Sequence, residues 1–240
     1  MLIKIIKLFL RKLNKIFNVT VNYRKVFNLP LRNINGRWFV TGRSFELPFV
    51  FNNIDFNGVN KRILEFGCFK SYLAIELATI GYDVTGIDLR DYSFKHPNLR
   101  IFKINILNYM DEEKFDYITS ISTIEHIGLG YYDQNEKGTD LNKVCEKLVS
   151  LLKDGGKLIF TVPVGMRYQD HFLRSFTRDE VINLFKGHLE LVKETYFRRY
   201  QNYQYWIRCD RNDIKQVSND REDCGPFGVN GIGCYVWKKK

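Results

Sequence analysis

Cysteine is scarce in this sequence, and its copies follow no pattern. Their number is odd, and no two of them stand in a Cys-x-x-Cys pair. A disulfide framework and a zinc site both need regular cysteine spacing, so we predict neither of them and no metal centre. A reducing cytoplasm fits this pattern best. The five cysteines are Cys68, Cys145, Cys209, Cys224 and Cys234.

Long apolar runs are absent from residues 1–17, where cations interrupt every run before it reaches four residues. This excludes a transmembrane helix and a signal sequence in that segment. At ~100° per residue the apolar side chains other than Leu8 share an arc of roughly 160°, and the cations lie opposite. We therefore predict a basic amphipathic helix that lies on the anionic inner face of a membrane. Docking against the same chain or a partner subunit needs the same apolar face and is the alternative. The cations are Lys4, Lys7, Arg11, Lys12 and Lys15.

Acidic residues are fewer than basic ones: 27 Asp and Glu against 37 Lys and Arg give a net charge of +10. Such a balance favours anionic partners, namely nucleic acid, a phosphorylated substrate or a membrane surface. The joint abundance of Lys, Asn, Ile, Phe and Tyr offers a second explanation, because a compositionally biased genome produces it without selection for charge. No repeat or low-complexity segment interrupts the 240 residues, so one α/β domain is expected. We divide the chain into the helix at 1–20, a cap segment at 21–60, and a domain at 61–240 with a loop-rich insert near 209–231.

The stretch 61–91, KRILEFGCFKSYLAIELATIGYDVTGIDLRD, has the order of a strand, a glycine turn, a helix and a second strand. Such a unit places its two strands in parallel. Two acids mark the strand ends, Glu65 beside the first and Asp88 directly after the second. An acid at the second position can accept hydrogen bonds from both hydroxyls of a ribose. The turn at Gly67 lets a ligand approach the backbone at the start of a helix.

Strands and helices go on alternating after Asp88. Asn105 and Ile106 close the third strand, where a polar side chain followed by an apolar one can bond the amine edge of an adenine and cover its face. We predict a Rossmann-like α/β fold: a seven-stranded, mostly parallel sheet with an antiparallel last strand and helices on both faces. The predicted strands lie at 37–41, 62–66, 84–87, 99–104, 115–121, 157–162, 189–196 and 232–237. The predicted helices lie at 45–54, 71–80, 141–152 and after the capping box Thr177–Glu180.

Four motifs, in this order, resemble those of the class I S-adenosylmethionine-dependent methyltransferases. ILEFGCFKS (63–71) resembles the family's glycine-rich first motif, and VTGIDLRDY (84–92) its acidic second-strand motif. FDYITSISTIEHIG (115–128) resembles the fourth-strand motif, and LKDGGKLIFTVP (152–163) the turn into strand five. The resemblance covers residues 58–200. The stretches GYDVTGIDLRD and ISTIEHIGLG are most similar to a bacterial branch associated with surface polysaccharide and glycolipid modification.

By position, the resemblance implies a site for S-adenosylmethionine. Glu65 and Gly67 would line its methionine part, Asp88 would hold the ribose, and Asn105 with Ile106 would meet the adenine. The further cofactor-binding candidates by position are Cys68, Ser71, Leu89 and Ser122.

One position departs from the family pattern. Phe69 stands where the family has its second glycine, and Ser71 stands at the third. A side chain at position 69 restricts the backbone and can crowd the cofactor. A degenerate binding module that keeps the fold without turnover is therefore an alternative to an active enzyme.

Methyl transfer to a hydroxyl needs an in-line approach to the sulfonium carbon and a base that takes the hydroxyl proton. His126 and Glu125 follow the fourth strand at the carboxyl edge of the sheet, where ligands bind in such folds. We predict that His126, alone or paired with Glu125, is this base. The alternative is that one of the two caps the next helix or holds the loop.

Other polar side chains near this edge have open roles. Asp133 and Asp140 could complete a magnesium site with the fourth-strand acid, since magnesium takes hard oxygen ligands. His171, Arg174 and Arg178 follow strand five and can bind a phosphate or carboxylate of the acceptor, and we predict the first two as substrate-binding. A solvated charged loop explains these three residues equally well.

Motifs of several other enzyme classes are missing. Amino-directed nucleic-acid methyltransferases resemble one another in an Asn/Asp-Pro-Pro-aromatic motif after strand four, where this chain has STIEH. The Pro-Cys of cytosine C5 enzymes does not occur, and Gly67, Phe69 and Tyr72 do not supply the GxGxxG spacing of nicotinamide enzymes. RNA methylation stays open, because residues 198–206 mix arginines with aromatic rings that can stack bases. An ordinary strand edge carries the same mix.

Taken together, these features predict an O-methyltransferase for a sugar, glycolipid or related small-molecule hydroxyl in bacterial cell-surface glycan synthesis. Its partners would be that acceptor and an anionic membrane surface, with a second copy of the chain as a further option. We expect it in the cytoplasm or peripheral on the inner membrane face.

Overall fold

The fold is taken from a computed structural model, which describes residues 31–34, 37–200, 205–224 and 228–240. The amphipathic helix predicted at 1–20 lies outside the described residues. Within the described part of the chain, no helix is long and apolar enough to cross a bilayer.

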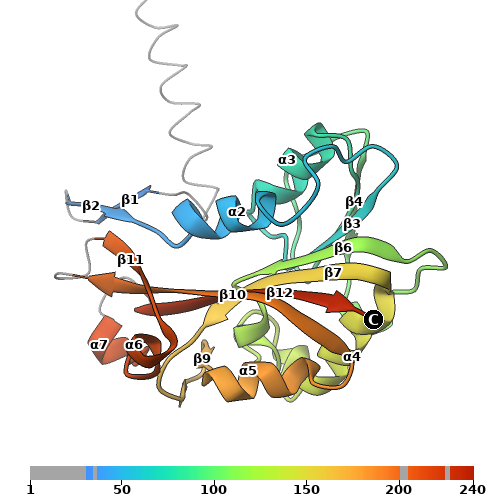
Figure 1. Ribbon diagram of the computed structural model, residues 1–240. Helices are drawn as coiled ribbons and strands as arrows, with labels where there is room; N and C mark the ends of the chain where they lie inside the picture. Colours follow the sequence, from blue (N-terminus) through green and yellow to red (C-terminus); the bar gives the residue numbers. More distant parts are fainter. Residues whose placement is uncertain (1–30, 35–36, 201–204, 225–227) are drawn as a thin grey trace, which may run out of the picture.

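A sheet of eight strands forms the centre of the molecule (Figure 1). Five neighbouring strands are parallel, as the alternation of strands and helices predicts, and the other three pairs are antiparallel. The mixed α/β architecture is therefore confirmed. In spatial order the strands are β11 (Tyr205–Cys209), β10 (Leu189–Tyr200), β12 (Gly231–Lys239), β7 (Leu152–Pro163), β6 (Phe115–Ile121), β3 (Arg62–Phe66), β4 (Asp83–Asp88) and β5 (Leu99–Lys103).

The sheet has one strand more than the seven predicted. The additional strand, β11, is the edge strand beyond β10, and it pairs with residues 196–200 of β10 through the backbone. Its side chains are exposed or only half-buried. A strand without an apolar run carries little signal in its sequence, because backbone pairing rather than side-chain burial holds it.

Helices cover both faces of the sheet. In Figure 1, α2 (Arg43–Phe51) and α3 (Leu73–Thr79) lie above the sheet, and α4 (Leu141–Leu151) and α5 (Arg178–Phe185) lie below it. The capping box predicted at Thr177–Glu180 is present at the start of α5, with both reciprocal hydrogen bonds formed. The short helical turns are η1 (Ile106–Asn108), η2 (Ile124–His126), η3 (Gln134–Glu136), α6 (Arg211–Lys215) and α7 (Arg221–Cys224). Two small hairpins complete the described part, β1 (Leu31–Ile34) with β2 (Arg37–Val40) and β8 (Tyr168–Gln169) with β9 (Arg174–Ser175).

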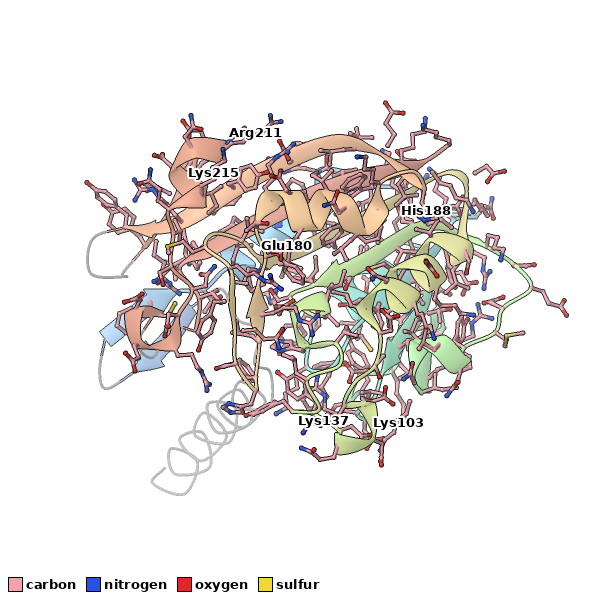
Figure 2. The ribbon with its side chains drawn as sticks, turned by 90° about the horizontal axis from the view of Figure 1, so that it is seen from below. Lys103, Lys137, Glu180, His188, Arg211 and Lys215 are labelled. Carbon is pink, nitrogen blue, oxygen red and sulfur yellow. The ribbon has the colours of Figure 1, made fainter. Side chains whose placement is uncertain are left out.

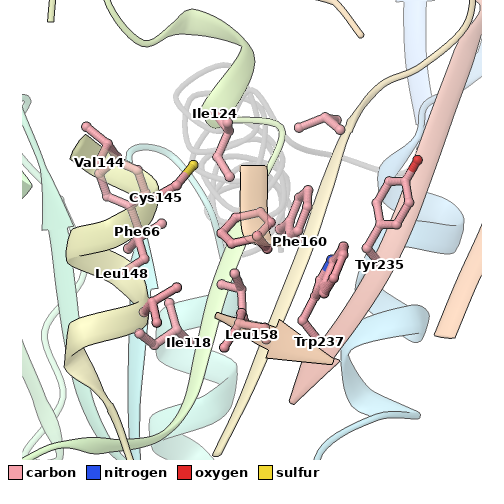
Figure 3. Close-up of a cluster of buried hydrophobic side chains, with 14 of the residues drawn as sticks. Phe66, Ile118, Ile124, Val144, Cys145, Leu148, Leu158, Phe160, Tyr235 and Trp237 are labelled. Carbon is pink, nitrogen blue, oxygen red and sulfur yellow. The ribbon is translucent and has the colours of Figure 1, made fainter. Parts of the chain in front are cut away.

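The hydrophobic core lies in two layers, one on each face. On the α4 and α5 face, Leu148 and Phe160 are fully buried, and Figure 3 shows how α4 packs its apolar side against the strands. On the other face, Val50 of α2 and Leu77 of α3 are also fully buried. Each such side chain contributes about 1.5–3 kcal/mol relative to an exposed one. Helix α2, which begins before the predicted domain, is thus part of its core.

Candidate active site

A cavity of about 290 Å³ lies at the carboxyl ends of β3, β4, β5 and β6. Its walls come from the turn after β3, the ends of β4 and β5, the segment 121–139 that follows β6, and Arg43 of α2. Parallel strands deliver their carboxyl ends to this same edge, which is where ligands bind in open α/β sheets.

Seven of the predicted site residues line this cavity, and six do not. The seven are Gly67, Asp88, Leu89, Asn105, Ile106, Ser122 and His126. Glu65, Cys68, Ser71 and Glu125 are buried outside the lining, His171 is exposed, and Arg174 lines a separate cavity of about 560 Å³.

Gly67 turns the chain at the end of β3, and no larger residue fits there. Its φ is +83°, in the left-handed region. A Cβ atom at this position would lie 2.1 Å from Oγ1 of Thr123, which comes from the segment after β6. Glycine thus allows two loops to meet closely at the cavity wall.

Asp88 is buried at the end of β4 and receives three N–H donors. The backbone N–H of Phe69 donates to its Oδ2 at 2.9 Å. The backbone N–H and the Nε–H of Arg90 donate to its Oδ1 at 3.0 and 3.1 Å. Its carboxylate is therefore held in one orientation on the cavity wall before any ligand binds.

The Phe69 ring, at the position where the family has glycine, lies on the cavity wall. The Arg90 guanidinium lies 3.8 Å from the centroid of this ring and 4.0 Å from that of Tyr132. Arg90 is thus a cation between two aromatic rings from different loops. Sequence reasoning missed this contact, because Tyr132 is remote in sequence from the first two motifs.

Three buried candidates lie behind the first turn. Glu65 is 1% exposed, and its Oε2 has no hydrogen-bond partner. Burial raises the pKa of Glu65 to about 7, opposed by a hydrogen bond from Ser71 and by the charge of Arg43. The Ser71 hydroxyl also accepts from the N–H of Leu73 at the start of α3. Cys68 is fully buried, and burial raises the pKa of its thiol.

Asn105 caps the helical turn η1 at the end of β5. Its Oδ1 accepts from the N–H of Leu107 at 2.8 Å, and its Nδ2 donates to Oε2 of Glu136. The next residue, Ile106, is buried and contributes an apolar surface to the cavity. The two predicted adenine residues therefore lie together, and Glu136 joins them from the loop after β6.

Ser122 directly follows β6 and has a φ of +48°, which is uncommon for a residue with a side chain. A network built on Glu46 of α2 holds it there. The Ser122 and Thr161 hydroxyls donate to Glu46 Oε1 at 2.8 and 2.6 Å, and Arg43 Nη1 donates to Glu46 Oε2 at 2.6 Å. Glu46 is 1% exposed. Arg43 and Glu46 were missed by sequence reasoning, since an i, i+3 pair on a helix does not reveal which loop it contacts.

His126 lies in the helical turn η2, with its ring on the cavity wall. Its Nδ1 lies 2.6 Å from the carbonyl oxygen of Phe172. A carbonyl can only accept, so Nδ1 carries the proton and Nε2 has a free lone pair in the neutral ring. Burial lowers the pKa of His126 to about 4, so the ring is neutral at physiological pH.

Glu125 is buried beside His126 without a direct hydrogen bond between the two. The distance from its Oε1 to Nε2 of His126 is 3.8 Å, which is too long for one. Its Oε2 has no hydrogen-bond partner, and burial raises the pKa of Glu125 to about 8. At neutral pH it is a protonated acid and not a base.

The remaining polar candidates have structural partners. Arg174 donates to the carbonyl of Ile127 at 2.7 Å, and Arg178 pairs with Glu194 at 3.0 Å. Asp133 and Asp140 accept from backbone N–H groups at the starts of η3 and α4. Among the described residues, no group of three or more metal-ligating side chains is close enough to hold an ion.

The aromatic residues considered for RNA binding are partly used in packing. Trp206 packs edge-on against Phe45 of α2, with ring centroids 5.2 Å apart, and donates its indole N–H to the carbonyl of Val40, while Tyr200 packs against Tyr205. Trp206 thus joins the N-terminal segment to the edge of the sheet.

The residues of the cavity fit an adenosyl cofactor. Glycine at position 67 leaves room for a close approach, and Asp88 presents an oriented acceptor for hydroxyl groups. Glu65, one residue before Phe66 of the wall, does not line the cavity, and its buried Oε2 has no hydrogen-bond partner.

Comparison with known proteins agrees with this geometry. Residues 46–202 match the family model described as a methyltransferase domain. The chain is 27% identical over 136 residues to a ubiquinone biosynthesis O-methyltransferase of Hydrogenovibrio crunogenus, covering 52% of each chain. It thus spans about half the length of the curated relatives it matches.

Solved structures show the same fold at low sequence identity. The N-methyltransferase NodS of Bradyrhizobium japonicum, in complex with S-adenosylhomocysteine, has a TM-score of 0.53 at 14% identity and covers 92% of this chain and 97% of its own. A methyltransferase of Methanosarcina mazei has a TM-score of 0.52 at 14% identity, covering 80% and 97%. With the matched domain and the site at the strand ends, this chain belongs to the class I S-adenosylmethionine-dependent methyltransferases.

Proposed function

We propose that this chain transfers the methyl group of S-adenosylmethionine to a hydroxyl of a small-molecule acceptor, with His126 as the general base. The observation that carries the proposal is the hydrogen bond between Nδ1 of His126 and the carbonyl of Phe172. It leaves Nε2 without a proton in the neutral ring of a residue that lines the cavity.

Some residues of the cavity would bind the cofactor, and another would deprotonate the acceptor. When bound, S-adenosylmethionine supplies an electrophilic methyl carbon on a sulfonium centre. Asp88 would accept from the ribose hydroxyls, Gly67 would allow a close approach, and Asn105 with Ile106 would meet the adenine. His126 would take the acceptor's proton at Nε2 while the methyl group passes from sulfur to the acceptor oxygen, which leaves S-adenosylhomocysteine and a protonated imidazole.

The surroundings of His126 favour this proton transfer. The rings of Tyr132 and Phe172 pack around it, with centroid distances of 5.1 and 4.8 Å, and limit the access of water. Glu125 holds its own proton at neutral pH, so it does not compete as a base. This leaves His126 as the group that deprotonates the acceptor.

Two acceptor classes fit the proposal. A sugar or glycolipid hydroxyl is favoured by the resemblance of the strand-end motifs, and Tyr131, which lines the cavity and is partly exposed, offers an aromatic ring to the apolar face of a sugar. The relatives named for ubiquinone biosynthesis support O-methylation and add an intermediate of that pathway as the second class. We place the sugar class first and test both.

The test is methyl transfer from labelled S-adenosylmethionine to a panel of glycan, glycolipid and ubiquinone-pathway hydroxyl compounds. With the best acceptor, His126→Ala is expected to lower kcat by about a hundredfold or more, the usual contribution of a general base. The matched control is His188→Ala, an exposed histidine after α5 (Figure 2). Near-wild-type turnover of His126→Ala at saturating acceptor would show that another group is the base.

The pH profile gives an independent readout. A base is lost when it is protonated, so turnover falls only as the pH approaches the pKa of about 4 of His126. We expect kcat to stay nearly constant from pH 6 to pH 5, where an ordinary histidine loses most of its neutral form and where Glu65 and Glu125 are already protonated. A roughly tenfold fall across this range would contradict the buried, neutral base.

We also propose that residues 1–20 hold the enzyme on an anionic membrane, where a glycolipid acceptor is found. The support is the sequence pattern of that segment. Flotation with vesicles of phosphatidylglycerol and phosphatidylethanolamine tests it. Full-length protein that stays at the bottom of the gradient would exclude membrane binding without affecting the proposed chemistry.

A further inference from the structure

We propose that Glu136, in the loop 128–138 after β6, is the residue that recognises the amine of the cofactor's adenine. This loop, whose Tyr131 is proposed to contact the acceptor, would then also contribute a residue to the cofactor site. The inference rests on the proposed position of the adenine against Asn105 and Ile106.

Asn105 cannot supply a strong acceptor by itself. Its Oδ1 already accepts from the N–H of Leu107 at 2.8 Å, which fixes the amide in one orientation. Its Nδ2 is a donor and therefore cannot accept from an adenine amine. A neutral amide oxygen shared in this way is a weaker acceptor than a carboxylate.

Glu136 brings a carboxylate to the same place. Its Oε2 accepts from Nδ2 of Asn105 and, at 3.0 Å, from the hydroxyl of Thr139. Among the described residues, Oε1 has no hydrogen-bond partner, and Glu136 lines the cavity beside Asn105. The carboxylate is thus positioned by one oxygen and has the other available for a ligand.

The loop that carries Glu136 is fixed at both ends. The N–H of Gly138 donates to the carbonyl of Gly128 at 2.9 Å, and both glycines have a positive φ. In Figure 2, Lys137 of this loop and Lys103 at the end of β5 lie at the same edge of the molecule, in agreement with the Asn105–Glu136 hydrogen bond. Glu136 therefore reaches β5 as part of a closed loop.

A second acid of the loop, Asp133, also lines the cavity. Its Oδ1 accepts from the N–H of Asn135 and caps η3, and it makes no hydrogen bond to Asn105. Because only Glu136 contacts the predicted adenine residue, Asp133 serves as the matched control.

The test compares two ligands that differ at the C6 and N1 edge of the base. S-adenosylhomocysteine has an amine at C6 that donates to a carboxylate, whereas S-inosylhomocysteine has at C6 a carbonyl that a carboxylate repels, and an N–H at N1. Titration calorimetry on the full chain gives both dissociation constants. We expect the wild type to prefer the adenosyl compound by about tenfold or more, as for a hydrogen bond to a charged group.

Glu136→Gln is expected to reduce this preference to about threefold or less, because an amide can donate to the carbonyl as well as accept. The double variant Asn105→Asp with Glu136→Gln returns a carboxylate to the same edge and should restore the preference. Asp133→Asn should keep the wild-type ratio. A ratio of two constants is insensitive to a general loss of stability, and circular dichroism verifies the fold of each variant.

Three results would overturn the inference: a wild-type ratio in Glu136→Gln, an equal loss in Asp133→Asn, or no recovery in the double variant. Failure of the proposed function looks different. In that case the wild type binds both compounds but transfers no methyl group to any hydroxyl acceptor, and the ratio test still decides the role of Glu136.

Discussion

Glu65 and Glu125, two carboxyl groups next to the cavity, lie in similar surroundings, and their pKa values are shifted in the same direction. Both are buried, each has an oxygen without a partner, and burial raises the pKa of both. Asp88 is almost as deeply buried but receives three N–H donors. At the scale of the residue, Glu65 and Glu125 thus differ from Asp88 in each having a buried oxygen without a hydrogen-bond donor.

Glu125→Gln tests this at the residue scale. The folded-state pKa of Glu125, about 8, lies above that of the unfolded chain, so wild-type stability is lost as the pH rises from about 4.5 to 8. Glutamine has no such loss. We expect the variant to gain stability over the wild type as the pH rises through that window, by on the order of 1 kcal/mol for each pH unit, measured by urea unfolding.

The control is Glu146→Gln, an exposed glutamate of α4. Its unfolding is measured over the same pH range, so that the difference between the two variants isolates the effect of the buried position. Parallel pH curves for Glu125→Gln and the wild type would show that Glu125 is ionised in the folded protein.

At the scale of the element, α2 is connected to the site by a buried polar network and not only by apolar packing. Glu46 accepts from Arg43, from Ser122 after β6, and from Thr161 of β7. The helix thus fixes the residue with positive φ at the end of β6. This connection explains why a helix outside the predicted domain bears on the geometry of the cavity.

Glu46→Ala should destabilise the protein by at least about 3 kcal/mol, because it leaves the Arg43 guanidinium without its carboxylate and two hydroxyls without their acceptor. Chemical unfolding measures the change. The double variant Arg43→Ala with Glu46→Ala removes the unpaired cation and should recover at least about 1 kcal/mol. A double variant less stable than Glu46→Ala would show that the two residues act independently.

At the scale of the whole molecule, the parallel half of the sheet positions the cavity, and the antiparallel half extends the core away from it. A ligand that binds the cavity contacts β3, β4, β5 and the segment after β6 together. Binding therefore stabilises the folded domain as one unit, since the unfolded chain has no such site.

S-adenosylhomocysteine at one hundred times its dissociation constant should stabilise the wild type by about 2.7 kcal/mol, seen as a rise of Tm in calorimetry. Asp88→Asn keeps the shape of the side chain and removes the carboxylate. We expect it to lose most of this rise at the same ligand concentration. An equal rise in wild type and Asp88→Asn would remove Asp88 from the ribose site.

The parallel strands could be predicted from the sequence, because short strand-like runs alternate with turns and helices, and the first two end at Gly67 and Asp88. The positions of Asp88, Asn105 and His126 could be predicted from this alternation, since residues that end or follow a parallel strand lie at the common edge of the sheet. Edge strand β11 could not be predicted, because its pairing is made by the backbone.

Residues that reach the cavity from segments other than the strand ends were not predicted. Arg43 arrives from an N-terminal helix and Glu136 from a loop, and only tertiary contacts bring them to the strand ends. Arg174 shows the reverse: it follows strand five in the sequence, but β9 directs it to a different cavity. Local patterns encode strand ends well and the paths of loops poorly.

The closed loop 128–138 has a consequence for engineering new specificities. Tyr132 contacts Arg90 and His126, and Glu136 contacts Asn105. Grafting a loop from another enzyme to change the acceptor would therefore also remove contacts to residues 90 and 105. The loop should therefore be transplanted together with residues 88–106. A library that varies the loop alone changes acceptor selectivity at the cost of weaker cofactor binding.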